Sequence, residues 1–79
     1  KLENSEVSIF PTIVKDFLKI KNAMGEVKIV NSNGRVVEIF TIDNDEISSI
    51  NLESLVKGVY FVYTKNKNNF ITVNKIVKD

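Results

Sequence analysis

Short apolar runs, separated by turn-forming residues at intervals of about ten, are the feature that most constrains the fold of this chain. Residues 17–21 alternate apolar and charged side chains, which is the period of two of a half-buried strand. Residues 59–64 are almost wholly β-branched or aromatic, so we expect a central strand with both faces covered. Residues 26–30 and 35–42 flank Asn33-Gly34, which predicts a hairpin because Asn-Gly readily adopts positive φ.

Three further runs complete the predicted strands. Residues 7–10 are followed by Pro11, which favours a strand end because proline cannot donate to a ladder. Residues 47–52 and 70–77 are the other two runs. Between them we expect one helical turn at residues 53–57, closed by Gly58 in a left-handed conformation. Seven β segments predict an all-β fold, an antiparallel β-sandwich of about seven strands.

The chain has room for one domain. Its 79 residues are too few for two, and we expect a linker or frayed start at residues 1–6 before a domain at residues 7–79. No apolar stretch approaches the roughly 20 residues of a transmembrane helix, and the first residues lack the basic-then-apolar order of a signal peptide. If the protein is exported, its amino-terminal signal is expected outside these residues.

Composition argues against catalysis. The chain has no cysteine, which excludes disulfides and thiolate metal sites, and no histidine, which removes the commonest general base and metal ligand. Ser48, Ser49 and Ser54 therefore have no imidazole to activate them, and no Gly-x-Ser-x-Gly elbow surrounds them. We predict that the domain is not an enzyme and holds no cofactor.

Charge is nearly balanced. Eleven basic and ten acidic residues give a formal net charge of +1, which disfavours nucleic acid as a partner. Asp43, Asp45 and Glu46 cluster as calcium ligands can, but Ile47 follows directly and the spacing is poor. We interpret this cluster as a solvated turn.

Aromatic residues in the predicted central strand have two interpretations. Tyr60, Phe61 and Tyr63 could form a sugar-binding platform or could fill the core. Successive strand residues point to opposite faces, so Phe61 and Tyr63 share one face and Tyr60 takes the other. Core filling is favoured, because a sugar platform usually also carries tryptophan and this chain has none.

The last predicted hairpin is basic. Its turn, residues 65–69, has no glycine or proline, so we expect an asparagine to supply any positive φ. Lysines recur in and after this turn, at Lys65, Lys67, Lys75 and Lys78. They could form a recognition surface or could protect an edge strand against aggregation, and the residues alone leave both open.

Four segments resemble a known family, in its order and spacing. Residues 7–20 (VSIFPTIVKDFLKI) are similar to the opening of the type A C-terminal sorting domains of the Bacteroidetes type IX (Por) secretion system. Residues 27–37 (VKIVNSNGRVV) resemble that family's strand, turn and Gly-Arg-aliphatic element, and residues 50–62 (INLESLVKGVYFV) its Leu-x-x-Gly-x-Tyr signature. Residues 73–78 (VNKIVK) look like its lysine-bearing last strand. Pro11-Thr12-Ile13 departs from the family's Pro-Asn-Pro.

This resemblance implies a fold and a function. It implies a seven-stranded immunoglobulin-like sandwich that acts as a C-terminal secretion signal for an upstream passenger in the same chain. The implied partners are the type IX translocon or an adaptor and a sortase-like protease, with transit through the periplasm to the cell surface or the medium. Such a signal is expected at the extreme carboxyl end of its protein.

The recognition surface that we predict comprises six residues: Gly34, Arg35, Gly58, Tyr60, Lys75 and Lys78. Gly34 and Gly58 have an alternative explanation in backbone geometry. Two other functions stay open for the domain as a whole. One is a carbohydrate-binding or adhesive module of a surface protein, and the other is a passive spacer.

Overall fold

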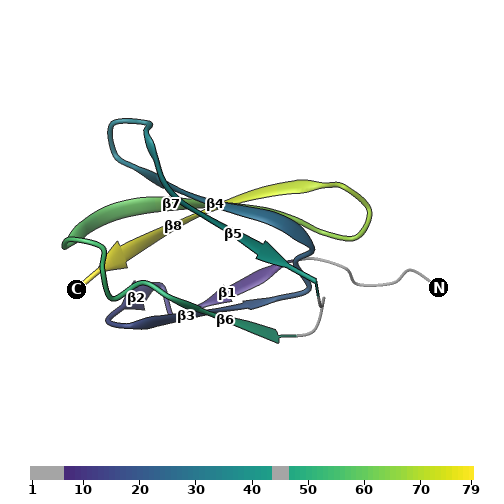
Figure 1. The fold of residues 1–79 in the computed structure, drawn as a ribbon, viewed down its shortest axis with the longest axis horizontal. Helices are drawn as coiled ribbons and strands as arrows, with labels where there is room; N and C mark the ends of the chain where they lie inside the picture. The colour runs from purple at the N-terminus through teal and green to yellow at the C-terminus, as the bar shows by residue number, and fades with distance from the viewer. Residues whose placement is uncertain (1–6, 44–46) are drawn as a thin grey trace.

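The computed structural model describes residues 7–43 and 47–79, and these residues form strands and turns without a helix. The strands make two sheets, three-stranded in the order β1-β3-β6 and five-stranded in the order β2-β8-β7-β4-β5 (Figure 1). The prediction of an all-β sandwich is confirmed, with eight strands where about seven were expected. The strands are β1 (Ser8–Phe10), β2 (Ile13–Val14), β3 (Phe17–Lys21), β4 (Gly25–Asn31), β5 (Val36–Ile42), β6 (Ile47–Asn51), β7 (Gly58–Lys65) and β8 (Ile71–Lys78).

The additional strand is β2, which lies in the other sheet from β1. β1 pairs antiparallel with β3, whereas β2 pairs parallel with β8, with Ile13 opposite Val77. Pro11 stands between the two short strands, as expected for a proline at a strand end, and the Phe10-Pro11 peptide is cis. With β1, β3 and β6 in one sheet and β4, β7 and β8 in the other, the strands divide as in an immunoglobulin-like sandwich.

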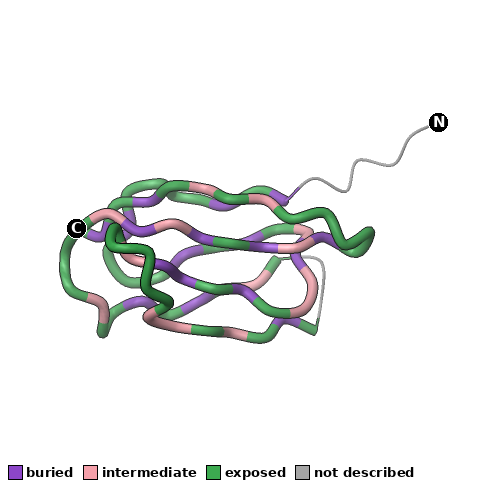
Figure 2. Tube along the Cα trace, turned by 90° about the horizontal axis from the view of Figure 1, so that it is seen from above, coloured by how far each residue is buried: buried purple, intermediate pink, exposed green. Residues whose placement is uncertain are grey.

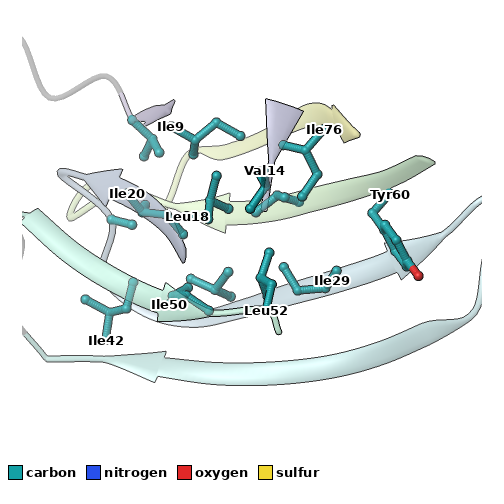
Figure 3. Packing of buried hydrophobic residues seen from close by; sticks show 14 residues of the cluster. Ile9, Val14, Leu18, Ile20, Ile29, Ile42, Ile50, Leu52, Tyr60 and Ile76 are labelled. Carbon is teal, nitrogen blue, oxygen red and sulfur yellow. The ribbon is translucent and has the colours of Figure 1, made fainter. Parts of the chain in front are cut away.

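The core lies between the two sheets and follows the alternation of the strands. In β3, Leu18 and Ile20 are buried and Lys19 and Lys21 are exposed. Figure 2 shows the same exchange of buried and exposed residues along the other strands. Side chains from both sheets fill the interior, among them Leu18, Ile29 and Ile76 (Figure 3). Burying each of these contributes about 1.5–3 kcal/mol.

β7 is central, as predicted, because it lies between β8 and β4. Its coverage was predicted wrongly. Tyr60 and Val62 are buried against the other sheet, but on the opposite side Phe61 is only half-buried and Tyr63 is exposed. The sandwich has two layers, so nothing in the described part of the chain covers the outer side of this strand.

The predicted β4–β5 hairpin is confirmed, and of the Asn33-Gly34 pair only the glycine adopts positive φ. Asn33 does not have positive φ, whereas Gly34 does, at 84°. The Gly34 amide donates to the Asn31 carbonyl at 2.9 Å, and the Asn31 amide donates to the Arg35 carbonyl at 2.9 Å. This is a type I turn followed by a left-handed residue, a common three-residue hairpin loop.

The turn between β7 and β8 repeats this loop. Asn66 takes the place of Asn31, and Asn69, with φ of 68°, takes the place of Gly34. An asparagine therefore supplies the positive φ in this turn, as predicted. Both loops project from the five-stranded sheet, at opposite ends of the molecule (Figure 1).

The predicted helical turn before β7 is absent. Residues 52–57 form turns and bends, in which the Leu55 amide donates to the Leu52 carbonyl at 3.1 Å. Asn51 accepts a hydrogen bond at Oδ1 from the Glu53 amide at 2.8 Å, which offers the backbone an alternative to helix. Gly58 is the first residue of β7, at φ of 150°, and does not cap a helix.

Candidate recognition surface

Strand register brings part of the predicted recognition surface to one end of the sandwich. Gly58 lies opposite Lys78, and Asn31, at the start of the β4–β5 turn, lies opposite Tyr60. The turn that holds Gly34 and Arg35 therefore stands at the same end as the start of β7 and the carboxyl end of β8 (Figure 1). Residues separated by more than forty positions in the chain meet here only after the sheet has formed.

Tyr60 has a structural role at this end. Its side chain is 5% exposed, and its hydroxyl donates to the Val56 carbonyl at 2.7 Å. A tyrosine near the start of strand F, the position that β7 takes here, that bonds to backbone a few residues upstream is the tyrosine corner of immunoglobulin-like sandwiches. The burial of Tyr60 agrees with core filling and leaves little of the side chain for a partner. Phe61 and Tyr63 lie on the other side of β7, as predicted from the alternation.

The two lysines of β8 point in opposite directions. Lys75, opposite Phe61, is exposed on the outer side of the sheet, whereas Lys78 is 8% exposed on the inner side. Both lysines belong to the predicted recognition surface, which requires exposed side chains, and the burial of Lys78 does not meet that requirement. An odd separation along a strand places two residues on opposite faces, and a buried lysine lays its methylenes along apolar surface.

Gly34 and Arg35 lie in the exposed hairpin loop. Asn31 Oδ1 accepts hydrogen bonds from the amides of Asn33, at 2.9 Å, and Arg35, at 3.0 Å. Gly34 is in the left-handed region, where glycine costs least. Backbone geometry therefore accounts for Gly34, and the exposed Arg35 side chain is the one available to a partner.

Sequence reasoning missed the outer face of the five-stranded sheet. On β8, Ile71 and Val73 point outward, whereas Thr72 and Asn74 point toward the other sheet. This alternation reverses the usual arrangement of apolar side chains inside and polar side chains outside. The signal was present in the sequence, since the residues at odd positions from 71 to 77 are Ile71, Val73, Lys75 and Val77.

Acidic groups are sparse at the described surface. Lys28 and Glu26, on the outer side of β4, form an ion pair at 4.0 Å. In residues 7–43 and 47–79 no three acidic side chains gather as metal ligands could. Asp45 and Glu46 of the predicted solvated turn, like the predicted linker at residues 1–6, lie outside these ranges. The described residues also include no helix able to cross a membrane.

The comparison with protein families decides the identity of this sandwich. The model of the secretion system C-terminal sorting domain, the sorting domain of type IX secretion, matches residues 8–79. The chain belongs to this family. The match begins at β1 and runs past the end of β8, so the sorting domain and the β-sandwich coincide. Sorting domains of this family are generally non-catalytic and serve export to the cell surface or secretion. A search of curated proteins finds no match to this chain.

Proposed function

We propose that this domain is a non-catalytic sorting signal that directs an upstream passenger through the periplasm and across the outer membrane by the type IX system. The observation that carries the proposal is the family match, which spans the whole sandwich. The partners are the translocon or an adaptor, and a sortase-like protease that removes the domain.

The fold supports recognition of a folded surface in place of a linear peptide. The loop with Arg35 and the end of β8 are far apart in the chain and lie at one end of the sandwich. A transport component that contacts both would respond to the folded domain and would ignore unfolded chains.

An open strand edge supports main-chain recognition. β2 pairs with β8 only at Val77 and Lys78, so within the described residues the rest of that edge, from Ile71 to Ile76, has no neighbouring strand. An extended segment of a partner can add to such an edge through main-chain hydrogen bonds.

Reporter export tests the proposal. The 79-residue chain is fused to the carboxyl end of a periplasmically targeted reporter in a type IX-competent bacterium, and reporter at the cell surface and in the medium is measured. We expect export that is lost when residues 73–79 are deleted and when the translocon gene is deleted. Export that does not require residues 73–79 would exclude the sorting function.

Two lysine variants separate recognition from folding. Lys75→Ala should lower export with little change in melting temperature, because its side chain is exposed. Lys78→Ala should lower the melting temperature, because Lys78 is buried, and its effect on export then follows from folding. If Lys75→Ala is exported at the wild-type level, Lys75 has no role in recognition.

A further inference from the structure

The outer face of the five-stranded sheet, meaning the side chains that point away from the three-stranded sheet, carries many exposed apolar side chains among a few charged ones. One row crosses four strands in register, from Ile39 through Lys28 and Tyr63 to Val73. Neighbours in such a row have Cβ atoms about 4.5–5.5 Å apart, so their side chains touch. Exposed large hydrophobic side chains on this face include Ile13, Ile39, Tyr63, Ile71, Val73 and Val77. Large apolar patches on the surface of a soluble monomer usually mark an interaction site.

The opposite face of the sandwich differs. On the outer side of the three-stranded sheet, Lys19 lies opposite Ser49 and Phe10, and Phe17 lies opposite Asn51. Polar side chains thus separate the exposed apolar ones there. The contrast assigns the unusual apolar surface to one sheet.

β8 gives an independent indication that its outer side is made for contact. Asn74 points inward, and among the described residues its buried Oδ1 has no hydrogen-bond partner. A buried acceptor without a partner lowers the stability of the fold, because its lost hydration is not replaced. Val73, beside it, points outward with 48% of its surface exposed. Folding alone would favour a valine on the inner side and an asparagine on the outer side. The chain therefore retains an arrangement that suits a partner on the outer side.

Charge selects the partner. Lys28, Lys65 and Lys75 lie on this face with one carboxylate, Glu26, so the strands of the face carry three positive charges and one negative charge, a net +2. Within the described residues, neither Lys65 nor Lys75 has a carboxylate within 4.0 Å. Two copies stacked on this face would bring lysines together. A lipid surface would have to cover Lys28, which lies between Tyr63 and Ile39 in the middle of the apolar row.

A shallow hollow of about 170 Å³ marks where a partner side chain can enter. It is lined by Glu26, Lys28, Tyr63, Thr64, Lys65 and Ile71. Its aromatic and aliphatic walls suit an apolar anchor, and the ammonium groups at its border suit carboxylates beside that anchor.

We propose that the outer face of the five-stranded sheet docks onto a folded protein whose contact surface is apolar and carries carboxylates. The inference rests on the proposed sorting function, and it locates the docking surface on a sheet face, on which Lys75 lies between Val73 and Val77. The recognition residues predicted from the sequence lie mostly at one end of the sandwich.

Photo-crosslinking tests the face in cells that export the reporter fusion. Tyr63→p-benzoylphenylalanine places the probe on the outer face, and Phe17→p-benzoylphenylalanine is the control on the other sheet, with exposures of 40% and 51% in the native residues. We expect one discrete protein adduct from position 63 and none from position 17. The adduct should decrease at least about tenfold with Lys75→Glu and persist with Lys75→Arg.

Export provides a second readout with matched variants. Val73→Glu should lower export at least about tenfold. The new carboxylate would be repelled by the carboxylates of the partner or would be buried against its apolar surface, and either weakens binding. Ile47→Glu, at a strand position of similar exposure on the other sheet, should export within about twofold of wild type. Melting temperatures of both variants show whether folding is preserved, and the crosslinking result does not depend on either variant.

The outcomes are distinguishable. A wild-type fusion that stays inside the cell overturns the sorting function and this inference with it. Normal export with no position-63 adduct overturns the docking face alone. An adduct of two fusion chains identifies a second copy, and binding to phosphatidylglycerol vesicles without a protein adduct identifies a lipid surface; each overturns the acidic protein partner. An adduct unaffected by Lys75→Glu also overturns it.

Discussion

Asn31 and Asn66 close the two hairpins of the five-stranded sheet in the same way. Each accepts two backbone hydrogen bonds at Oδ1, from residues two and four positions later, at 2.8–3.0 Å. Each also accepts at its carbonyl from the residue three positions later, at 2.9 Å. The sequences share little beyond two asparagines, Asn-Ser-Asn-Gly-Arg and Asn-Lys-Asn-Asn-Phe. The side-chain acceptor at the first position is therefore the common cause of the loop.

Removing either acceptor should destabilise the domain. Asn31→Ala is expected to lower the free energy of unfolding by about 1 kcal/mol, because water can replace the lost acceptor at an exposed loop. Asn66→Ala should cost about 2 kcal/mol, since Asn66 is buried and its donors are less accessible. Urea denaturation of the chain measures both. Asn31→Asp keeps the acceptor, and a loss equal to that of Asn31→Ala would show that the side-chain bonds are irrelevant.

The left-handed positions of the two loops should tolerate the same residues. Gly34→Ala is expected to cost about 1–2 kcal/mol, because alanine is strained at positive φ. Gly34→Asn should cost less than half as much, since Asn69 already occupies the equivalent position. Unfolding free energies and reporter export are measured together. If Gly34→Asn folds normally but is not exported, Gly34 contributes more than backbone geometry.

The hydroxyl of Tyr60 should contribute to stability. Tyr60→Phe removes the donor to the Val56 carbonyl and is expected to cost about 1–2 kcal/mol. Tyr63→Phe is the matched control, because Tyr63 is exposed, and should change stability by less than about 0.5 kcal/mol. Thermal and urea unfolding give both values. Equal effects of the two variants would show that the bond to Val56 has no net value.

Replacing Asn74 should stabilise the domain. Asn74→Val removes a buried oxygen that has no hydrogen-bond partner in residues 7–43 and 47–79, and it adds a β-branched side chain at a strand position. The expected gain in unfolding free energy is about 1 kcal/mol. Asn74→Asp places a charge at the same site and should lower the melting temperature. Thermal unfolding of both variants provides the measurement. Destabilisation by Asn74→Val would mean that the amide satisfies a need of the native fold.

Local pattern predicted most of the strands. The alternation of residues 17–21 was sufficient because side chains on a strand change face with every residue, whatever the strand pairs with. The predicted central position of residues 59–64 was also correct, since an apolar run of that composition is favoured where strands lie on both sides. The prediction of a helical turn before β7 was wrong. The side chain of Asn51 accepts a hydrogen bond from the Glu53 amide, and such side-chain bonds compete with helix formation.

The candidate site was harder to predict because it depends on which strands pair and on which face of each sheet is covered. The sequence by itself determined the all-β class, the family resemblance and the loops that contain Gly34 and Asn69. Only the tertiary structure decided that Tyr60 bonds to Val56, that Lys78 is buried while Lys75 is exposed, and that Ile39 and Val73 belong to one surface. Which side of a strand is covered depends on the sheet that packs against it. Strand pairing joins residues that are far apart in the chain. The local alternation of side chains does not determine which face of the sheet packs against the other sheet.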